Sequence, residues 1–178
     1  MFGKAVCAIC AVALVAGCKA QPAANQANAV IPSAETANAA SAAAPLSHDQ
    51  ALALMKQRHD HMEAFGDETK KVHNALQTSS PDVNAIRQSA AKIAELAPKL
   101  VSWFPAGTGA DVGKTRAKAE IWQKPEDFAL KGQDFETAAN QFKVAADRGD
   151  LSQINTTFAA LGKSCKACHD LYRAPEKH

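Results

Sequence analysis

The segment Cys165-Lys166-Ala167-Cys168-His169 places two thiols and an imidazole within five positions of a 178-residue chain. On a helix, side chains three and four positions apart lie on one side, so these groups would project together. Two such thiols can add to the two vinyl groups of a porphyrin, and a neutral imidazole offers the lone pair that iron needs. The pattern is typical of covalent haem c, with Cys165 and Cys168 as thioethers and His169 as an axial iron ligand.

Two other chemistries fit the same pair of cysteines. An exported compartment favours a disulfide, in which case His169 would be unrelated to the pair. A redox-active pair of the thioredoxin type is the other alternative, but no strand–helix–strand pattern surrounds these residues. Haem attachment accounts for the imidazole as well as the thiols, and it is the interpretation that we prefer.

The beginning of the chain has the pattern of an export signal. Lys4 supplies a positive charge, and the apolar run Ala5–Ala16 is too short to span a bilayer. The run leads into Val15-Ala16-Gly17-Cys18, which resembles the lipobox of bacterial lipoproteins. We therefore predict a lipoprotein signal peptide over residues 1–17 and lipidation of Cys18. An ordinary cleavage site followed by an incidental cysteine is the alternative.

The other cysteines and the next segment agree with this organisation. Cys7 and Cys10 lie within the apolar run and would leave with the signal; Ala11 follows them, so they form no haem motif. After Cys18 the residues are mostly Ala, Asn, Gln, Ser and Pro, which supply too little bulky apolar surface for a core. Residues 18–46 are predicted to be a lipidated flexible tether about 30 Å in coil dimension, and residues 47–178 the folded domain.

Composition narrows the classes of function. Lys plus Arg number 20 and Asp plus Glu number 18, with no clustered basic excess, so we expect no nucleic-acid binding. No apolar run reaches eighteen residues, so no transmembrane helix is expected. No further acid, base or metal cluster has convincing spacing, so we expect no enzyme.

From Ser47 onward the pattern is helical. A first helix is predicted to open with a capping box at Ser47 and Gln50 and to continue, with a bend allowed after Gly66, through Val72 and Leu76. A second is predicted to begin with Ser80 as N-cap and to be distorted at Pro98. The predicted apolar face of the first helix comprises Leu52, Met55, His59, Met62 and Phe65.

Two further helices complete the pattern after a long connection over residues 102–124. The third is predicted to run from Pro125 to a cap at Gly149, and the fourth to open at Asp150. The third helix carries Phe128, Phe135 and Phe142 at intervals of seven; the stripe of the fourth is Leu151, Ile154, Phe158, Leu161, Cys165, Cys168 and Tyr172. Four amphipathic helices predict an all-α four-helix bundle.

Residues 47–173 resemble the class II cytochromes c, the family that includes cytochrome c prime. The most specific resemblance is the haem motif near the carboxyl end. Phe104-Pro105-Ala106-Gly107-Thr108-Gly109 and Ile121-Trp122 followed by Pro125 and Phe128 also look like the family. The resemblance implies an antiparallel bundle with one covalently bound haem between the helices, often assembled as a homodimer.

The resemblance also implies roles for single residues. Arg173 matches an arginine near the proximal face of the haem, and Arg58 matches one near the haem propionates. Met62, four residues after Arg58, would face the distal side of the iron. It is either a sixth ligand, as in low-spin relatives, or a non-ligating residue of the distal pocket; plain core packing is the alternative.

These features predict a protein exported to the periplasmic side of a membrane and held there by a lipid anchor. The leading expectation is electron transfer with a redox partner protein that the sequence does not identify. A five-coordinate haem binding nitric oxide or another small gas is the second, and a structural lipoprotein without haem is the third. Lys163, Lys166, Arg173 and Lys177 form either a docking rim or a solvated face. His59 and His61 point apart, so they should not chelate one metal.

Overall fold

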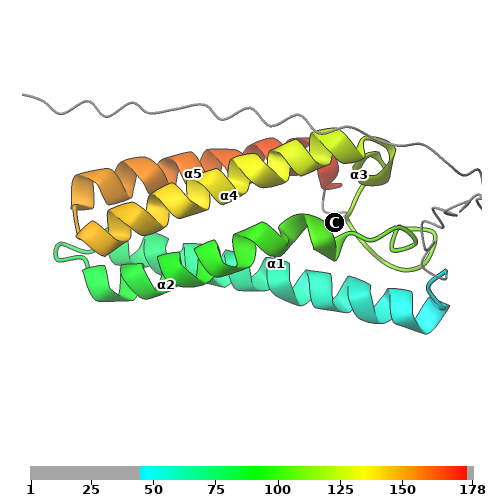
Figure 1. The fold of residues 1–178 in the computed structure, drawn as a ribbon. Helices are drawn as coiled ribbons and strands as arrows, with labels where there is room; N and C mark the ends of the chain where they lie inside the picture. Colours follow the sequence, from blue (N-terminus) through cyan, green and yellow to red (C-terminus); the bar gives the residue numbers. More distant parts are fainter. Residues whose placement is uncertain (1–44, 176–178) are drawn as a thin grey trace, which may run out of the picture. The chain divides into compact units, whose positions relative to one another are not determined.

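The computed structural model describes residues 45–175, whose long helices pack side by side (Figure 1). The elements in chain order are α1 (His48–Leu76), α2 (Val83–Leu96), the 3-10 helix η1 (Ala97–Trp103), α3 (Glu120–Gln123), α4 (Pro125–Arg148) and α5 (Leu151–Tyr172). The predicted all-α four-helix bundle is confirmed. The predicted signal peptide, Cys18 and the tether up to residue 44 lie outside the described residues, as does Lys177.

Local capping explains where α1 begins. The Ser47 side chain accepts a hydrogen bond from the Gln50 amide at 3.2 Å, and the Gln50 side chain accepts one from the Ser47 amide at 2.9 Å. The predicted capping box is therefore present. The helix continues past Gly66 through Val72 to Leu76, as predicted.

The buried face of α1 differs from the predicted apolar face. Leu52 is 39% exposed and His59 is also exposed, whereas Arg58 and Glu68 are buried. Met55 and Phe65 are buried as predicted. The difference arises because polar partners, most of them from other parts of the chain, form hydrogen bonds with Arg58 and Glu68 and so offset the cost of burying these charges.

The second helix begins later than predicted. Its N-cap is Asp82, whose carboxylate accepts hydrogen bonds from the amides of Asn84 and Ala85 at 2.9 and 3.1 Å. Ser80 and Pro81 lie before the helix. The predicted distortion at Pro98 is confirmed, because the chain tightens into η1 from Ala97 onward.

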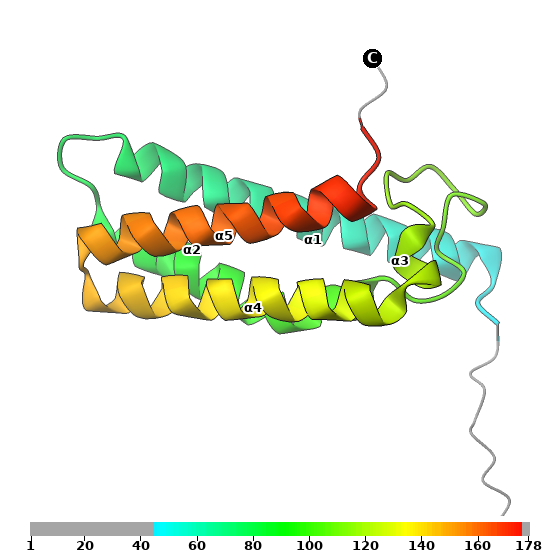
Figure 2. The same ribbon diagram turned by 90° about the horizontal axis from the view of Figure 1, so that it is seen from above.

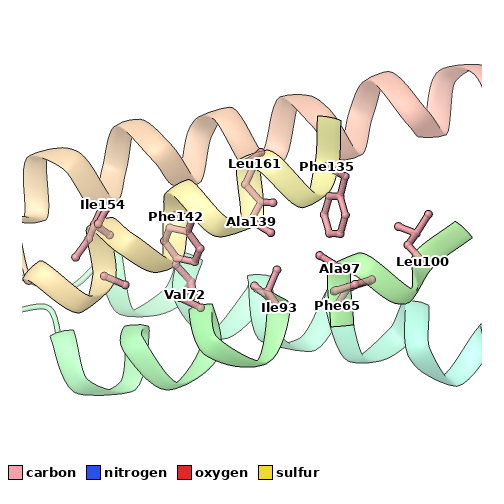
Figure 3. Packing of buried hydrophobic residues seen from close by; sticks show 14 of the residues in the cluster. Phe65, Val72, Ile93, Ala97, Leu100, Phe135, Ala139, Phe142, Ile154 and Leu161 are labelled. Carbon is pink, nitrogen blue, oxygen red and sulfur yellow. The ribbon is translucent and has the colours of Figure 1, made fainter. Parts of the chain in front are cut away.

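Caps and apolar spacing define α4 and α5. Gly149 has a φ of +74°, which favours glycine, and it ends α4 as predicted. Asp150 then caps α5 through the amides of Ser152 and Gln153. Phe135 and Phe142 point from α4 toward residues of α1 and α2 (Figure 3), and Phe142 is fully buried. The seven-residue phenylalanine spacing therefore supplies the centre of the core.

The two ends of the bundle differ. One end carries the short connections between α1 and α2 and between α4 and α5. At the other, the carboxyl end of α5 lies beside α3 and the long connection before it (Figures 1 and 2). Because α3 contacts α5, the end of α5 that carries the cysteine motif is also the end where the irregular segment packs. None of the helices described here is long and apolar enough to cross a membrane.

Glu68 forms a buried polar link between α1 and α2. Its side chain is 10% exposed and accepts hydrogen bonds from Ser89 Oγ at 2.7 Å, Lys71 Nζ at 2.9 Å and Lys92 Nζ at 3.3 Å. Burial raises the carboxyl pKa, but the three donors outweigh burial and bring the pKa below its ordinary value of 4.5. The ionised carboxylate therefore stabilises the folded state above that value, and the stabilisation is lost as the pH falls through the lower folded-state pKa.

We predict that Glu68→Gln lowers the free energy of unfolding by about 1–2 kcal/mol at pH 7, because it removes a charged acceptor from both lysines. The difference from the wild type should shrink at an acidic pH below 4.5, as the pH falls through the lowered pKa of the folded wild-type carboxyl and its charge is lost. Urea unfolding at both pH values measures this. Glu63→Gln is the control, since Glu63 pairs with His59 on the exposed surface at 3.2 Å. An equal loss at both pH values would contradict the assignment.

Candidate functional site

The cysteine motif lies in the last two turns of α5. Cys165 and Cys168 are half-buried and pack against the apolar core, and both are free thiols. Tyr172 follows one turn later and is buried, as the predicted stripe requires. His169 lies beside this stripe with an exposed side chain. The helix therefore presents two thiols toward the core and an imidazole toward its edge.

The setting keeps both thiols protonated. Burial raises the pKa of Cys165, and burial together with the neighbouring Cys165 raises the pKa of Cys168 to about 11. Lys131 of α4 acts in the opposite direction on Cys168 without overcoming these effects. Such thiols are weak nucleophiles at neutral pH.

The imidazole is held in its neutral form. Partial burial and then the positive charges of Arg173 and Arg116 lower the pKa of His169, although Asp170 opposes them. A neutral imidazole keeps a nitrogen lone pair available for a metal. Arg116 comes from the connection before α3, so two parts of the chain supply the positive field.

A chain of aromatic contacts connects α5 to α1. The Tyr172 ring packs edge-on against Phe128 with centroids 5.1 Å apart, and Phe128 packs edge-on against Phe104 at 4.9 Å. The guanidinium of Arg58 lies over the Phe104 ring, 4.8 Å from its centroid. The Tyr172 hydroxyl donates a hydrogen bond to Asp127 of α4, and burial followed by this bond raises the tyrosine pKa to about 12.

Arg58 is a buried cation, 5% exposed, whose partners are all neutral. Its Nη1 donates to Thr108 Oγ1 at 3.0 Å, and Nη2 donates to Thr108 O and Thr115 Oγ1 at 3.1 Å each. No carboxylate within the described part of the chain forms an ion pair with it. Burial lowers the pKa of the guanidinium, which nevertheless stays charged. A buried positive charge without a carboxylate suits an anionic group beside it.

The connection after η1 is fixed in place by side chains. Trp122 Nε1 donates to the carbonyls of Phe104 and Pro105 at 3.0 and 3.1 Å. Gly107 has a φ of +78°, which allows the turn, and the fully buried Thr108 donates to Pro105 O at 2.8 Å. The Phe104–Gly109 motif is therefore fixed in a conformation that places the Phe104 ring and the Thr108 oxygens against Arg58.

The end of α5 is joined to the same connection by backbone pairing. Lys118 N donates to Tyr172 O at 2.9 Å, and Ala174 N donates to Arg116 O at 2.7 Å. These bonds form the isolated bridge between Ala117 and Arg173, the only strand-like pairing within residues 45–175. Because Thr115 also accepts from Arg58, this segment connects α1 to the turn that carries His169.

Met62 lies on α1, one turn after Arg58, and is half-buried against the core cluster. Its neighbour His61 stacks on Trp103 with centroids 4.4 Å apart, and Phe65 contacts both Trp103 and Phe135. The thioether of Met62 is therefore on the inner side of α1, packed against the core cluster. His59 and His61 have separate partners, as their spacing predicted.

The structure groups the sequence-predicted residues in two places. Cys165, Cys168, His169 and Arg173 share the end of α5, whereas Arg58 and Met62 lie on α1. Thr108, Thr115, Arg116 and Asp127 were missed as members of this region. Thr108 lies within a motif that the sequence had singled out; the others carry no local signal. No group of three His, Cys, Asp or Glu side chains suited to a metal ion exists among the described residues.

Known proteins match this chain over its folded part. The family described as "Cytochrome C'" matches residues 53–173. The cytochrome c' of Pararhodospirillum photometricum is 33% identical over 121 residues, which cover 68% of this chain and 96% of that protein. This chain belongs to the cytochrome c' family. The recognition of class II cytochromes c in the sequence is confirmed.

Solved structures of cytochromes c' share the fold. One, described as having a ligand-controlled dimer dissociation, has a TM-score of 0.66 and 29% identity, and the match covers 74% of this chain and 100% of that one. The nitric oxide complex of a mutant cytochrome c prime from Alcaligenes xylosoxidans has a TM-score of 0.65 and 27% identity, with 71% and 97% coverage.

Cytochromes c' bind one covalent c-type haem, and this chain is accordingly a haem protein. The residues at the end of α5 and the buried Arg58 fit a covalently bound haem. Two half-buried thiols face an apolar cluster, a neutral imidazole lies one residue further along, and a buried guanidinium lacks a carboxylate partner. The donor set therefore offers thioether attachment, an iron ligand and a positive charge for an acidic substituent.

Proposed function

We propose that Cys165 and Cys168 form the two thioethers of the haem and that His169 is an axial ligand of its iron. The spacing on α5 supports this assignment, because all three side chains emerge from two adjacent turns. Arg58 would hold a haem propionate through its remaining donors, and Arg173 would act on the proximal side through its charge.

Electron transfer is the function that we propose for this site. The iron of a bound haem supplies one-electron chemistry, and the bundle sets its ligation and access to solvent. The observation that carries the proposal is the position of Met62, a half-buried thioether on the inner side of α1, one turn from Arg58. A thioether sixth ligand favours the reduced iron and closes the distal side, which suits an electron carrier.

Binding of nitric oxide or another small gas is the second candidate. It is favoured by the nitric oxide complex of the cytochrome c prime mutant from Alcaligenes xylosoxidans, which has the same fold. In this alternative Met62 does not ligate the iron, and it lines the distal pocket as an apolar side chain. The state of Met62 therefore separates the two functions. We propose no catalytic role for either state.

We further propose that the protein is exported to the periplasm and anchored to a membrane through Cys18. The support is the signal-like start of the chain and the small residues before this cysteine. Assembly as a homodimer is also proposed, and the relative described by its dimer dissociation supports it.

Replacing both Cys165 and Cys168 by Ala should give protein without stably attached haem, because no sulfur remains to form a thioether. Haem staining after denaturing electrophoresis measures the attachment. Lys166→Ala, between the two cysteines, is the matched control and should stain like the wild type. Stain that persists in the double variant would refute the assignment.

Met62→Leu should convert a low-spin ferric haem to high-spin, lower its reduction potential and open it to nitric oxide. The two side chains are similar in volume, so packing should cost less than about 1.5 kcal/mol. Absorption spectra and potentiometry measure the change. Met55→Leu is the control, since Met55 is a buried methionine on α1 whose side chain lies against the Gly113 segment. A wild type that is already high-spin, with a variant that matches it, would refute ligation by Met62 and favour the second candidate function.

Cys18→Ser should abolish incorporation of labelled fatty acid into the protein, because the acylated sulfur is absent. Cys7→Ser, within the predicted signal, should leave labelling unchanged. Metabolic labelling followed by immunoprecipitation measures both. Equal labelling of the Cys18 variant and the wild type would exclude lipidation at this position.

A further inference from the structure

The connection before α3 turns a row of cations outward. Thr115 and Ala117 face the protein, since Thr115 Oγ1 accepts from Arg58 and Ala117 packs against the core cluster. In an extended segment, alternate side chains point to opposite sides. Lys114, Arg116 and Lys118 therefore lie on the other side, where Lys114 is exposed and Arg116 and Lys118 are half-buried.

This row lies at the end of α5 that carries the haem motif. The bridge between Ala117 and Arg173 places it along the last turn, and Arg116 Nε donates to Ala174 O at 2.9 Å. Figures 1 and 2 both show the connection beside this end of α5. The exposed His169 side chain lies there, within the electrostatic reach of Arg116 and Arg173.

Carboxylates do not neutralise most of these charges. Within residues 45–175, Lys114, Lys118 and Arg173 form no ion pair, and the nearby Asp170 pairs with Lys166 at 2.6 Å. Some lysines elsewhere have carboxylate partners, as at Lys56 and Lys143, whereas Lys70, Lys124 and Lys163 form no ion pair within residues 45–175, so what distinguishes this row is its place beside the haem motif. The formal net charge of the chain is only +2, so this local field is not a consequence of a basic protein. Uncompensated cations on one surface attract and orient an anionic partner.

We propose that Lys114, Lys118 and Arg173 form a cationic patch on which a redox partner with an acidic surface docks. The proposal rests on the proposed electron transfer, and it assigns the α5 end as the place where electrons enter and leave. The backbone hydrogen bonds at Lys118 and Ala174 hold the patch rigidly, so docking would not have to order a loose segment. The sequence had suggested a rim of Lys163, Lys166, Arg173 and Lys177; only Arg173 belongs to both sets.

The test compares two charge reversals of the haem-loaded protein. Lys114→Glu with Lys118→Glu changes the patch; Lys70→Glu with Arg148→Glu makes the same change in net charge at positions in the last turns of α1 and α4. Two probes of opposite charge are used. The anion ferricyanide takes one electron from the reduced protein and becomes ferrocyanide. The cation hexaammineruthenium(II) gives one electron to the oxidised protein and becomes hexaammineruthenium(III). Stopped-flow absorbance at low and high ionic strength gives the rates.

At low ionic strength the patch variant should react about tenfold more slowly with ferricyanide and faster with the ruthenium cation. The control pair should change either rate less than about twofold, and high salt should remove the difference. Equal changes in both pairs would overturn the patch, because only net charge would then matter. A wild type that exchanges electrons with neither probe would instead refute electron transfer itself.

Folding of the variants is checked by their circular dichroism and haem spectra. If the charge reversal disturbs the fold, Lys114→Gln with Lys118→Gln provides a milder change at the same positions. It should give a smaller effect in the same direction with each probe. An unchanged ferricyanide rate in this folded variant would also overturn the proposal.

Discussion

The buried guanidinium of Arg58 is the interaction on which the arrangement of the site depends. Its hydrogen bonds to Thr108 and Thr115 hold a long irregular connection against α1. The other end of that connection pairs with the residues after Tyr172 and so fixes the last turn of α5. A charge with this many fixed partners cannot move without breaking several bonds at once. The two helices that carry the proposed iron ligands, α1 and α5, are thereby fixed in position relative to each other.

Aromatic residues fill the space between α1, the connection and the end of α5. Phe104, Phe128 and Tyr172 form an edge-to-face series between α1 and α5, and Trp122 holds the turn at Phe104 through its indole N–H. Edge-to-face packing gives these rings defined orientations as well as buried area. The hydrogen bonds of Arg58 and the aromatic contacts therefore both hold the connection over residues 104–119. The connection is fixed in position although it contains no long helix or strand.

Much of this fold follows from local signals, which is why it was predictable. The caps at Ser47, Gly149 and Asp150 and the phenylalanine spacing of α4 each depend on neighbours in sequence. The two cysteines and His169 were identifiable for the same reason. The start of α2 was missed because Ser80 and Asp82 are both good N-cap residues two positions apart, and the sequence pattern does not distinguish them.

What the sequence did not show depends on contacts between distant residues. Arg58 is buried because threonines 50 and 57 positions away accept its hydrogen bonds, and Tyr172 meets Asp127 across 45 positions. No periodicity encodes such pairs. The outward row of cations is a similar case, since its place beside His169 follows from a single backbone bridge.

The protonated state of the two thiols has a consequence for how the holoprotein is assembled. In the closed bundle they are half-buried and their pKa values are raised, so little thiolate is available to react with a vinyl group. On a chain whose α5 is still open to solvent, the burial that raises the pKa of both thiols would be absent, and more thiolate would be available. For the proposed attachment at Cys165 and Cys168, the two thiols are therefore better nucleophiles before the helices close around them than in the folded bundle.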